Sequence, residues 1–275
     1  MAYKALKIDR EGQIAIVTLN RPDAGNALDF RLMVEVDDAM RVVGEDTDVR
    51  AVVLTGAGKN FCTGVDLGMF TNAEALVEKE GGEPDIQPLP DDQTYGKGTV
   101  VGAVLRIRAM PKPVIAAING AVVGAGLSLV LGCDMRIASE LARFGMVFVR
   151  RGIVPDTGGS FTLPRIVGLP KACELVLTGE TIDAAEAGRI GLVSKVVPHD
   201  DLMNEALALA GKVAKNPPLA VKMAKENLYQ AMAEADLLAQ MKREEAAQSI
   251  LLNTEDFQEA AVAFLEKREP KFKGK

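Results

Sequence analysis

Two glycine-bearing turns, each directly after a short apolar run, constrain this chain more than any other feature. Their sequences are Phe61-Cys62-Thr63-Gly64-Val65-Asp66-Leu67 and Asn119-Gly120-Ala121-Val122-Val123-Gly124-Ala125-Gly126. Each turn can point a backbone N–H at the same carbonyl oxygen, and fixed donors of this kind stabilise an enolate-like charge. We therefore predict that the turns form two halves of one oxyanion hole. The alternative is that both are ordinary tight strand-to-helix connections, in which glycine is common.

Composition limits the class of protein. The 275 residues are 48% apolar and 25% charged, which suits one large domain or one domain with an appendage. A net charge of -6 argues against a nucleic-acid partner. The longest apolar stretches, Pro113 to Ile118 and Leu127 to Leu131, fall short of the roughly 20 residues of a membrane span. No signal-peptide pattern opens the chain, so we expect a cytoplasmic protein without a membrane partner.

Motifs for metals and nucleotides are missing from the sequence. The three cysteines form no C-x-x-C pair, which favours reduced thiols over a disulfide or zinc site. The run Thr55-Gly56-Ala57-Gly58-Lys59-Asn60 follows an expected strand, but Phe61 replaces the third glycine of a dinucleotide loop. Asn60 also stands where a P-loop needs Ser or Thr. We expect no metal and no nucleotide cofactor.

The periodicity of apolar residues predicts alternating strands and helices in the first part of the chain. A helix is expected from Asn26 to Gly44 and another from Gly126 to Leu131. Strands are expected over Ile14 to Leu19, Val49 to Leu54, Pro113 to Ile118, Met135 to Ala138 and Ala142 to Phe148. The pattern favours an α/β fold.

Two other regions differ from this pattern. From about residue 200, helical periodicity covers Leu202 to Lys215, Leu219 to Ala233 and Ala235 to Ile250. We therefore divide the chain into a core, 1–199, and a helical region, 200–275. The segment from Thr71 to Gly98 is rich in glycine, proline and acidic residues, which predicts either a binding loop or a solvated excursion.

Several motifs in a fixed order carry a family resemblance. They are Leu19-Asn20-Arg21-Pro22, Asn26-Ala27-Leu28, Phe61 to Leu67, Ile118 to Gly126, Cys133 to Ala138, Gly152 to Gly159 and Phe264 to Arg268. Together they resemble the enoyl-CoA hydratase/isomerase (crotonase) family over nearly the whole chain. The resemblance implies a spiral of repeated ββα units, a C-terminal helical trimerisation region and an acyl-CoA substrate. It also implies a homotrimer or a dimer of trimers, with no cofactor beyond the coenzyme A of the substrate.

The same resemblance implies roles for individual residues. The oxyanion-hole donors would be the backbone N–H groups of Val65 and Ala125, although Ala125 stands where the family usually has glycine. The coenzyme A contacts would be Asp23, Ala24, Thr63, Leu67, Phe264 and Lys267. Asp23 departs from the basic residue common at its position, and Lys267 is alternatively a solvated lysine of a basic tail.

Hydratases of the family use two glutamates to activate and deliver water. Here those positions hold Ser128 and Phe148, neither of which is a competent general base, so both are assigned to the acyl pocket. Isomerases and dehalogenase-like members place a catalytic carboxylate where this chain has Asp156. The resemblance thus favours a shift of a double bond from 3-enoyl-CoA to 2-enoyl-CoA, with Phe148 in a wall that excludes water.

Other interpretations of these residues remain open at this point. Asp156 would also suit a turn or a helix N-cap. A hydratase with a nonstandard water site, a dehalogenase-like route with Asp156 as nucleophile, and a catalytically silent acyl-CoA-binding protein are alternatives. The single histidine, His199, lies in an expected turn, and no G-x-S-x-G nucleophile motif accompanies it.

Overall fold

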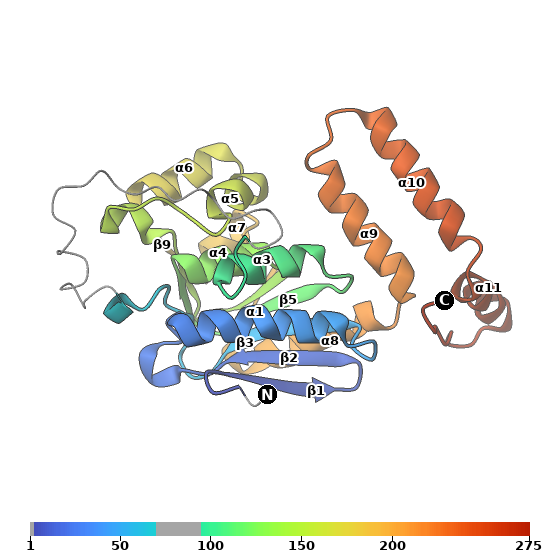
Figure 1. Cartoon of the computed structure of the whole chain (residues 1–275), viewed down its shortest axis with the longest axis horizontal. Helices are drawn as coiled ribbons and strands as arrows, with labels where there is room; N and C mark the ends of the chain where they lie inside the picture. Colours follow the sequence, from blue (N-terminus) through green and yellow to red (C-terminus); the bar gives the residue numbers. More distant parts are fainter. Residues whose placement is uncertain (1–2, 70–94) are drawn as a thin grey trace.

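Two β-sheets organise the chain in a computed structural model that describes residues 3–69 and 95–275 (Figure 1). The main sheet has the order β1-β2-β3-β5-β7-β10, and only its first pair, β1 and β2, is antiparallel. Its strands are β1 (Leu6–Glu11), β2 (Ile14–Leu19), β3 (Ala51–Gly56), β5 (Val114–Ile118), β7 (Met135–Ser139) and β10 (Lys195–Val197). A smaller sheet has the order β4-β6-β8-β9. Its strands are β4 (Asn60–Cys62), β6 (Ala121–Val123), β8 (Arg143–Gly145) and β9 (Thr181–Asp183).

A repeated unit connects the two sheets. Each of β3, β5 and β7 lies in the main sheet and is followed by a short strand, β4, β6 or β8, in the smaller one. After β6 the chain enters α4 (Ala125–Gly132), and after β8 it passes through η3 (Val147–Arg151) to α5 (Gly159–Val167). This succession is the spiral of ββα units that the family resemblance implied.

Helices bury both faces of the main sheet. Leu32, Val36 and Met40 of α1 (Phe30–Glu45) join a large apolar cluster with α3 (Val100–Ala109) and α4. On the other face, Leu202 and Ala206 of α8 (Leu202–Ala214) pack against alternate residues of β2, β3 and β5. Burial on both faces explains why these strands are almost continuously apolar.

The predicted helical region, 200–275, has two parts. α8 covers the main sheet and therefore packs as part of the core. The helices that follow are α9 (Pro218–Ala231), α10 (Leu237–Leu251) and α11 (Glu255–Glu266). They extend away from the two sheets, and we call them the C-terminal arm (Figure 1).

A buried ion pair fastens the arm to the core. The Lys225 ammonium of α9 donates to Asp134 Oδ2 at 2.8 Å and to the carbonyl oxygen of Ile107 at 2.6 Å. Tyr229, one turn further along α9, donates to the other carboxylate oxygen of Asp134 at 2.6 Å. Burial lowers the pKa of Lys225 and raises that of Tyr229. Asp134 also accepts the N–H of Val114 at 2.7 Å, so one carboxylate joins α9 to the start of β5.

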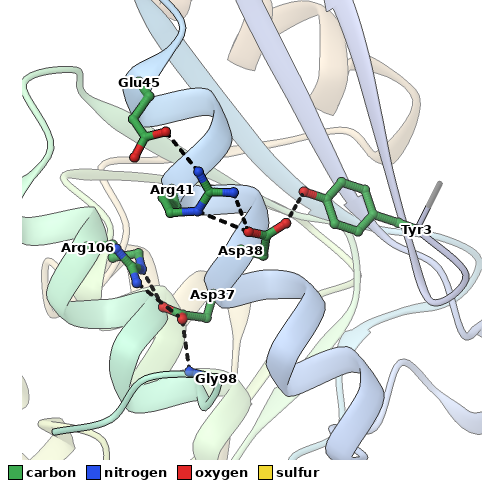
Figure 2. Close-up of polar contacts among 7 residues, drawn as sticks. All are labelled: Tyr3, Asp37, Asp38, Arg41, Glu45, Gly98 and Arg106. Carbon is green, nitrogen blue, oxygen red and sulfur yellow. Dashed lines mark hydrogen bonds and ion pairs between the residues drawn. The ribbon is translucent and has the colours of Figure 1, made fainter. Parts of the chain in front are cut away.

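Two consecutive carboxylates of α1 reach different neighbours (Figure 2). Asp37 is buried and accepts hydrogen bonds from Arg106 Nε of α3 at 2.6 Å and from the N–H of Gly98 at 2.9 Å. Asp38 accepts the Tyr3 hydroxyl at 2.9 Å and the Arg41 guanidinium at 2.6 Å. Burial, followed by the hydrogen bond to Asp38, raises the pKa of Tyr3 to about 12. Because Asp37 holds the N–H of Gly98, directly before the N-cap residue of α3, it fixes the place where the chain enters that helix.

The structure differs from the sequence prediction after β8. The strand expected over Ala142 to Phe148 is wrong in its second half, because β8 ends at Gly145 and Phe148 lies in η3. Gly152 closes this short helix in the left-handed conformation, with its N–H bonded to the carbonyl oxygen of Val149 at 3.1 Å. The loop predicted from Thr71 to Gly98 lies outside the described residues except for its last four. The remaining short elements are η1 (Pro22–Ala24), η2 (Leu67–Met69), α6 (Leu169–Thr178), α7 (Ala184–Arg189) and η4 (His199–Asp201).

Candidate active site

The two glycine turns lie against each other. Strands β4 and β6 are parallel neighbours, so the turns that follow them emerge at the same end of the smaller sheet. Gly64 and Gly124 both have positive φ, 94° and 55°. A Cβ added to Gly64 would lie 3.1 Å from the carbonyl oxygen of Val123, and one added to Gly124 would lie 4.0 Å from the Cα of Gly64. Glycine at both positions therefore permits the left-handed backbone and the close approach.

The N–H of Val65 is left free by the way its turn is held. Leu28 donates its N–H to the carbonyl oxygen of Gly64 at 2.8 Å and accepts the N–H of Asp66 at 3.0 Å. In such a parallel bridge, the N–H and C=O of the middle residue, Val65, point away from Leu28. Among the described residues, this N–H has no acceptor.

The N–H of Ala125 is free for a different reason. Ala125 is the first residue of α4, and the N–H groups of a helix's first turn have no acceptor within the helix. Within residues 3–69 and 95–275, no other acceptor is present for it. The helix dipole also favours negative charge at this end. The two N–H groups assigned from sequence to the oxyanion hole thus belong to adjoining turns, and neither has an acceptor among the described residues.

Ser128 and the turn that carries Asp156 lie next to each other at the start of α4. The Ser128 hydroxyl is buried and has no hydrogen-bond partner among the residues that the structure describes. It faces the first residue of α5, since a Cβ added to Gly159 would lie 2.7 Å from Ser128 Oγ. The N–H of Gly159 is bonded to the carbonyl oxygen of Asp156 at 2.8 Å. The turn that carries Asp156 therefore lies beside the first turn of α4.

The Asp156 carboxylate is exposed and is held by its neighbour in sequence. Thr157 Oγ1 donates to Asp156 Oδ1 at 3.0 Å. Thr157 is buried and has a φ of 54°, which is unusual for a β-branched residue and stores backbone strain. The carboxylate caps no helix in the described parts of the chain, because the N-cap of α5 is Gly158. The alternative role of Asp156 as a helix N-cap is therefore wrong, whereas its role as a turn residue stays open.

Phe148 is buried, as a pocket-wall residue would be. Its carbonyl oxygen accepts the N–H of Ile153 at 3.2 Å, which ties η3 to the segment leading to Asp156. Asp156 itself is exposed, and the described residues do not enclose it in the dry setting that we expected.

Three of the expected coenzyme A residues gather beside the first glycine turn. Asp23 and Ala24 form η1 with Pro22. The next residue, Gly25, accepts the N–H of Thr63 at 3.2 Å and its hydroxyl at 3.3 Å. Leu67 begins η2 close by in sequence, but its side chain is not described.

Phe264 and Lys267 are not brought to this group within one chain. The segment after them runs along the opposite end of the main sheet, where Arg50 donates to the carbonyl oxygen of Phe272 at 2.5 Å just before β3 begins. Figure 1 shows α11 and η2 at opposite ends of the molecule. The two residues also share no helical face, because α11 ends at Glu266 and Lys267 is left-handed, with a φ of 55°.

Two features of the site were not anticipated from sequence. One is the left-handed conformation of Thr157, for which the only signal was the Pro-Asp-Thr-Gly-Gly turn. The other is Arg21, whose guanidinium lies 3.2 Å from Asp66 and 3.3 Å from Asp29. Its signal was a cation in the Asn-Arg-Pro motif together with an acid directly after Val65.

Several alternative chemistries find no support in the described residues. Burial raises the pKa of the Cys62 thiol to about 12, so this group next to the first turn is a poor nucleophile. His199 is exposed in η4, and its Nδ1 lies 3.0 Å from Ser139 Oγ. It follows β10 of the main sheet, whereas the glycine turns follow β4 and β6 of the smaller sheet. The described residues include no group of three or more His, Cys, Asp or Glu placed to hold a metal ion.

None of the helices described is long and apolar enough to cross a membrane.

Comparisons with known proteins agree with this architecture. Residues 9–275 match the family model for enoyl-CoA hydratase/isomerase. A short-chain-enoyl-CoA hydratase of Clostridium acetobutylicum is 38% identical, over 95% of this chain and 94% of that protein. The 2,3-dehydroadipyl-CoA hydratase of Escherichia coli K12 is 37% identical, over 98% and 99%. The crystal structure of an enoyl-CoA hydratase from Bacillus anthracis superposes with a TM-score of 0.87 at 34% identity, over 99% of this chain and 100% of that one. The chain therefore belongs to the enoyl-CoA hydratase/isomerase family and has the crotonase fold.

Proposed function

We propose that this protein moves the double bond of an enoyl-CoA thioester from the 3 to the 2 position. One observation supports the proposal: the turn that carries Asp156 lies beside the first turn of α4. Ser128 and Phe148 stand where the family resemblance implies the two glutamates of hydratases. A double-bond shift needs one group that takes and returns a proton, whereas the usual hydratase mechanism needs two carboxylates around a water.

The reaction proceeds through a dienolate. The Asp156 carboxylate removes a proton from C2 of the 3-enoyl thioester, and the electron pair moves onto the thioester oxygen. The N–H groups of Val65 and Ala125 stabilise that oxygen. Asp156, now protonated, returns the proton to C4, the carbonyl re-forms, and the double bond lies between C2 and C3.

The substrate's coenzyme A moiety is the only cofactor in this proposal. Asp23, Ala24 and Thr63 adjoin the first turn and are suited to contact it. Phe264 and Lys267 are too far from that turn within one chain, so we assign them to coenzyme A held by a neighbouring copy. This assignment fits the proposed homotrimer, alone or paired, in which the C-terminal arm packs against other subunits.

Hydration of a 2-enoyl-CoA is the second candidate. Relatives over nearly the whole chain are named hydratases. In addition, the buried Ser128 hydroxyl lacks a partner, and a water held between it and Asp156 would satisfy it. In this version Asp156 takes a proton from that water as its oxygen adds to C3, and then returns the proton to C2 as the thioester carbonyl re-forms.

Parallel assays on two substrates separate the candidates. The wild type and Ser128→Ala would each be given a 3-enoyl-CoA and a 2-enoyl-CoA, with products resolved by chromatography. The proposal predicts 2-enoyl-CoA from the first substrate and little hydration of the second, with Ser128→Ala close to wild type. Rapid hydration that Ser128→Ala abolishes would favour the hydratase. Binding of both thioesters without any turnover would identify a silent acyl-CoA-binding protein.

A further inference from the structure

We infer that Arg21 is a positioning residue for the oxyanion hole, because its guanidinium ties the loop that carries Val65 to the start of α1. The inference rests on the donor role proposed for Val65 and adds a residue that does not itself touch the reacting atoms.

The guanidinium contacts three acceptors from two segments, residues 27–29 and residue 66. Its Nη2 lies 3.2 Å from Asp66 Oδ2 and 3.3 Å from Asp29 Oδ2, and its Nη1 donates to the carbonyl oxygen of Ala27. The side chains of Arg21, Asp66 and Asp29 are 23%, 29% and 30% exposed, so the bridge is partly shielded from solvent. Partial shielding makes such charges less sensitive to screening by salt.

Each end of the bridge is itself anchored. Asp29 is the N-cap of α1 and accepts the N–H of Leu32 at 2.7 Å. Asp66 uses its other oxygen to accept the N–H of Gly68 at 3.0 Å. Arg21 therefore joins a rigid helix start to the residue directly after Val65.

The bridge complements the backbone clamp on the same loop. Leu28 bonds to Gly64 and Asp66 on either side of Val65, and its own neighbours, Ala27 and Asp29, are held by Arg21. The two segments that form this clamp, residues 27–29 and residues 64–66, are thus tied to one guanidinium. Without that charge, the carboxylates of Asp29 and Asp66 would repel each other and spread the clamp. An oxyanion hole depends on donors that are already in place, so a small displacement of the Val65 N–H weakens it.

Lysine cannot replace arginine here. A guanidinium is a planar fork with five donors, whereas an ammonium is a compact charge on a flexible stem. Arg21→Lys keeps the charge but has no rigid fork with which to hold the three acceptors together. Asp66→Asn offers a second variant, which removes the charge from the loop end of the bridge while retaining an oxygen for Gly68.

The experiment measures the polarisation of a bound thioester carbonyl. Hexanoyl-CoA, isotope-labelled at that carbonyl, has no double bond to shift or hydrate, so its infrared stretch in complex with the protein reports on the oxyanion hole alone. The dissociation constant of the same ligand is measured alongside. Arg41→Lys is the matched control, because Arg41 pairs with Asp38 on another part of α1 (Figure 2).

We expect hexanoyl-CoA to show a lowered carbonyl frequency in the wild type and in Arg41→Lys. In Arg21→Lys and Asp66→Asn, at least half of that shift should be lost, while the dissociation constant of hexanoyl-CoA stays within about twofold of wild type. In the same variants, kcat for 3-enoyl-CoA should be about tenfold lower. A full shift in both bridge variants would overturn the inference, as would weakened binding with the shift intact, which would make Arg21 a coenzyme A contact. Absence of any shift in the wild type would instead remove the proposed oxyanion hole, and the inference with it.

Discussion

At the scale of the residue, Thr157 has a strained backbone and contacts the carboxylate that is proposed to move the proton. A buried threonine with a φ of 54° is held there by its surroundings, and its hydroxyl donates to the Asp156 carboxylate. Strained residues of this kind cluster at functional sites, where the strain serves to orient a group. We therefore expect the hydroxyl of Thr157 to aim the carboxylate that carries the proton.

Replacing Thr157 tests this orientation. Thr157→Val removes the hydroxyl while keeping the branched shape, and we expect kcat for 3-enoyl-CoA to fall about tenfold, the worth of one hydrogen bond to a charged group. KM should change little, because the coenzyme A contacts remain. Thr157→Ser keeps the hydroxyl and should retain most of kcat. Equal rates for the valine variant and the wild type would show that the hydrogen bond has no role in turnover.

At the scale of the element, Asp37 joins α1 to α3. The carboxylate is buried, and its loss would leave both the Arg106 guanidinium and the N–H of Gly98 without this acceptor (Figure 2). We expect Asp37→Ala to lower the free energy of unfolding by about 2–3 kcal/mol, as measured by urea denaturation. Asp38→Ala is the matched control on the same helix and should cost less, since that side chain is 38% exposed. A smaller loss for Asp37→Ala than for Asp38→Ala would contradict this account of α1.

Elements with strong periodicity could be predicted from sequence, and short ones could not. β2 and α8 were predicted nearly residue for residue, because long apolar patterns mark them. β4 and β6 have three residues each, too few to show a period, although the glycine turns follow them directly. β8, also of three residues, was predicted as part of a longer strand. The N–H groups of Val65 and Ala125 could be proposed because glycine spacing marks a turn. The bridge of Arg21 to Asp66 depends on a contact between distant segments, which no local pattern encodes. For Thr157, the Pro-Asp-Thr-Gly-Gly pattern predicts a turn but not which of its residues is left-handed.

At the scale of the whole molecule, the C-terminal arm carries several large apolar side chains that are exposed in the single chain. Leu228, Leu237 and Phe264 are 71%, 74% and 84% exposed in the single chain. Exposed large apolar side chains that gather on one part of a protein often mark an interface. We therefore expect copies of this chain to associate through the arm, as the proposed trimer requires.

Light scattering coupled to size-exclusion chromatography measures that association. The wild type should elute as a trimer or hexamer, and Leu228→Asp with Leu237→Asp should shift it towards monomer, because burying two carboxylates in an apolar interface is costly. Leu141→Asp is the control, since Leu141 is also exposed but lies outside the arm. Far-ultraviolet circular dichroism confirms that each variant is folded. A monomeric wild type at micromolar concentration would contradict the proposed assembly.

The central claim is that one carboxylate, Asp156, moves the proton, and its most direct test is the rate of conversion of a 3-enoyl-CoA to the 2-enoyl-CoA by the wild type and by Asp156→Asn. Asparagine keeps the size of the side chain and a hydrogen-bonding oxygen, so binding of the thioester should persist. We predict turnover by the wild type and a rate about 10²–10⁴-fold lower in the variant, the usual contribution of a general base. An Asp156→Asn protein that isomerises as fast as the wild type would show that another group carries the proton.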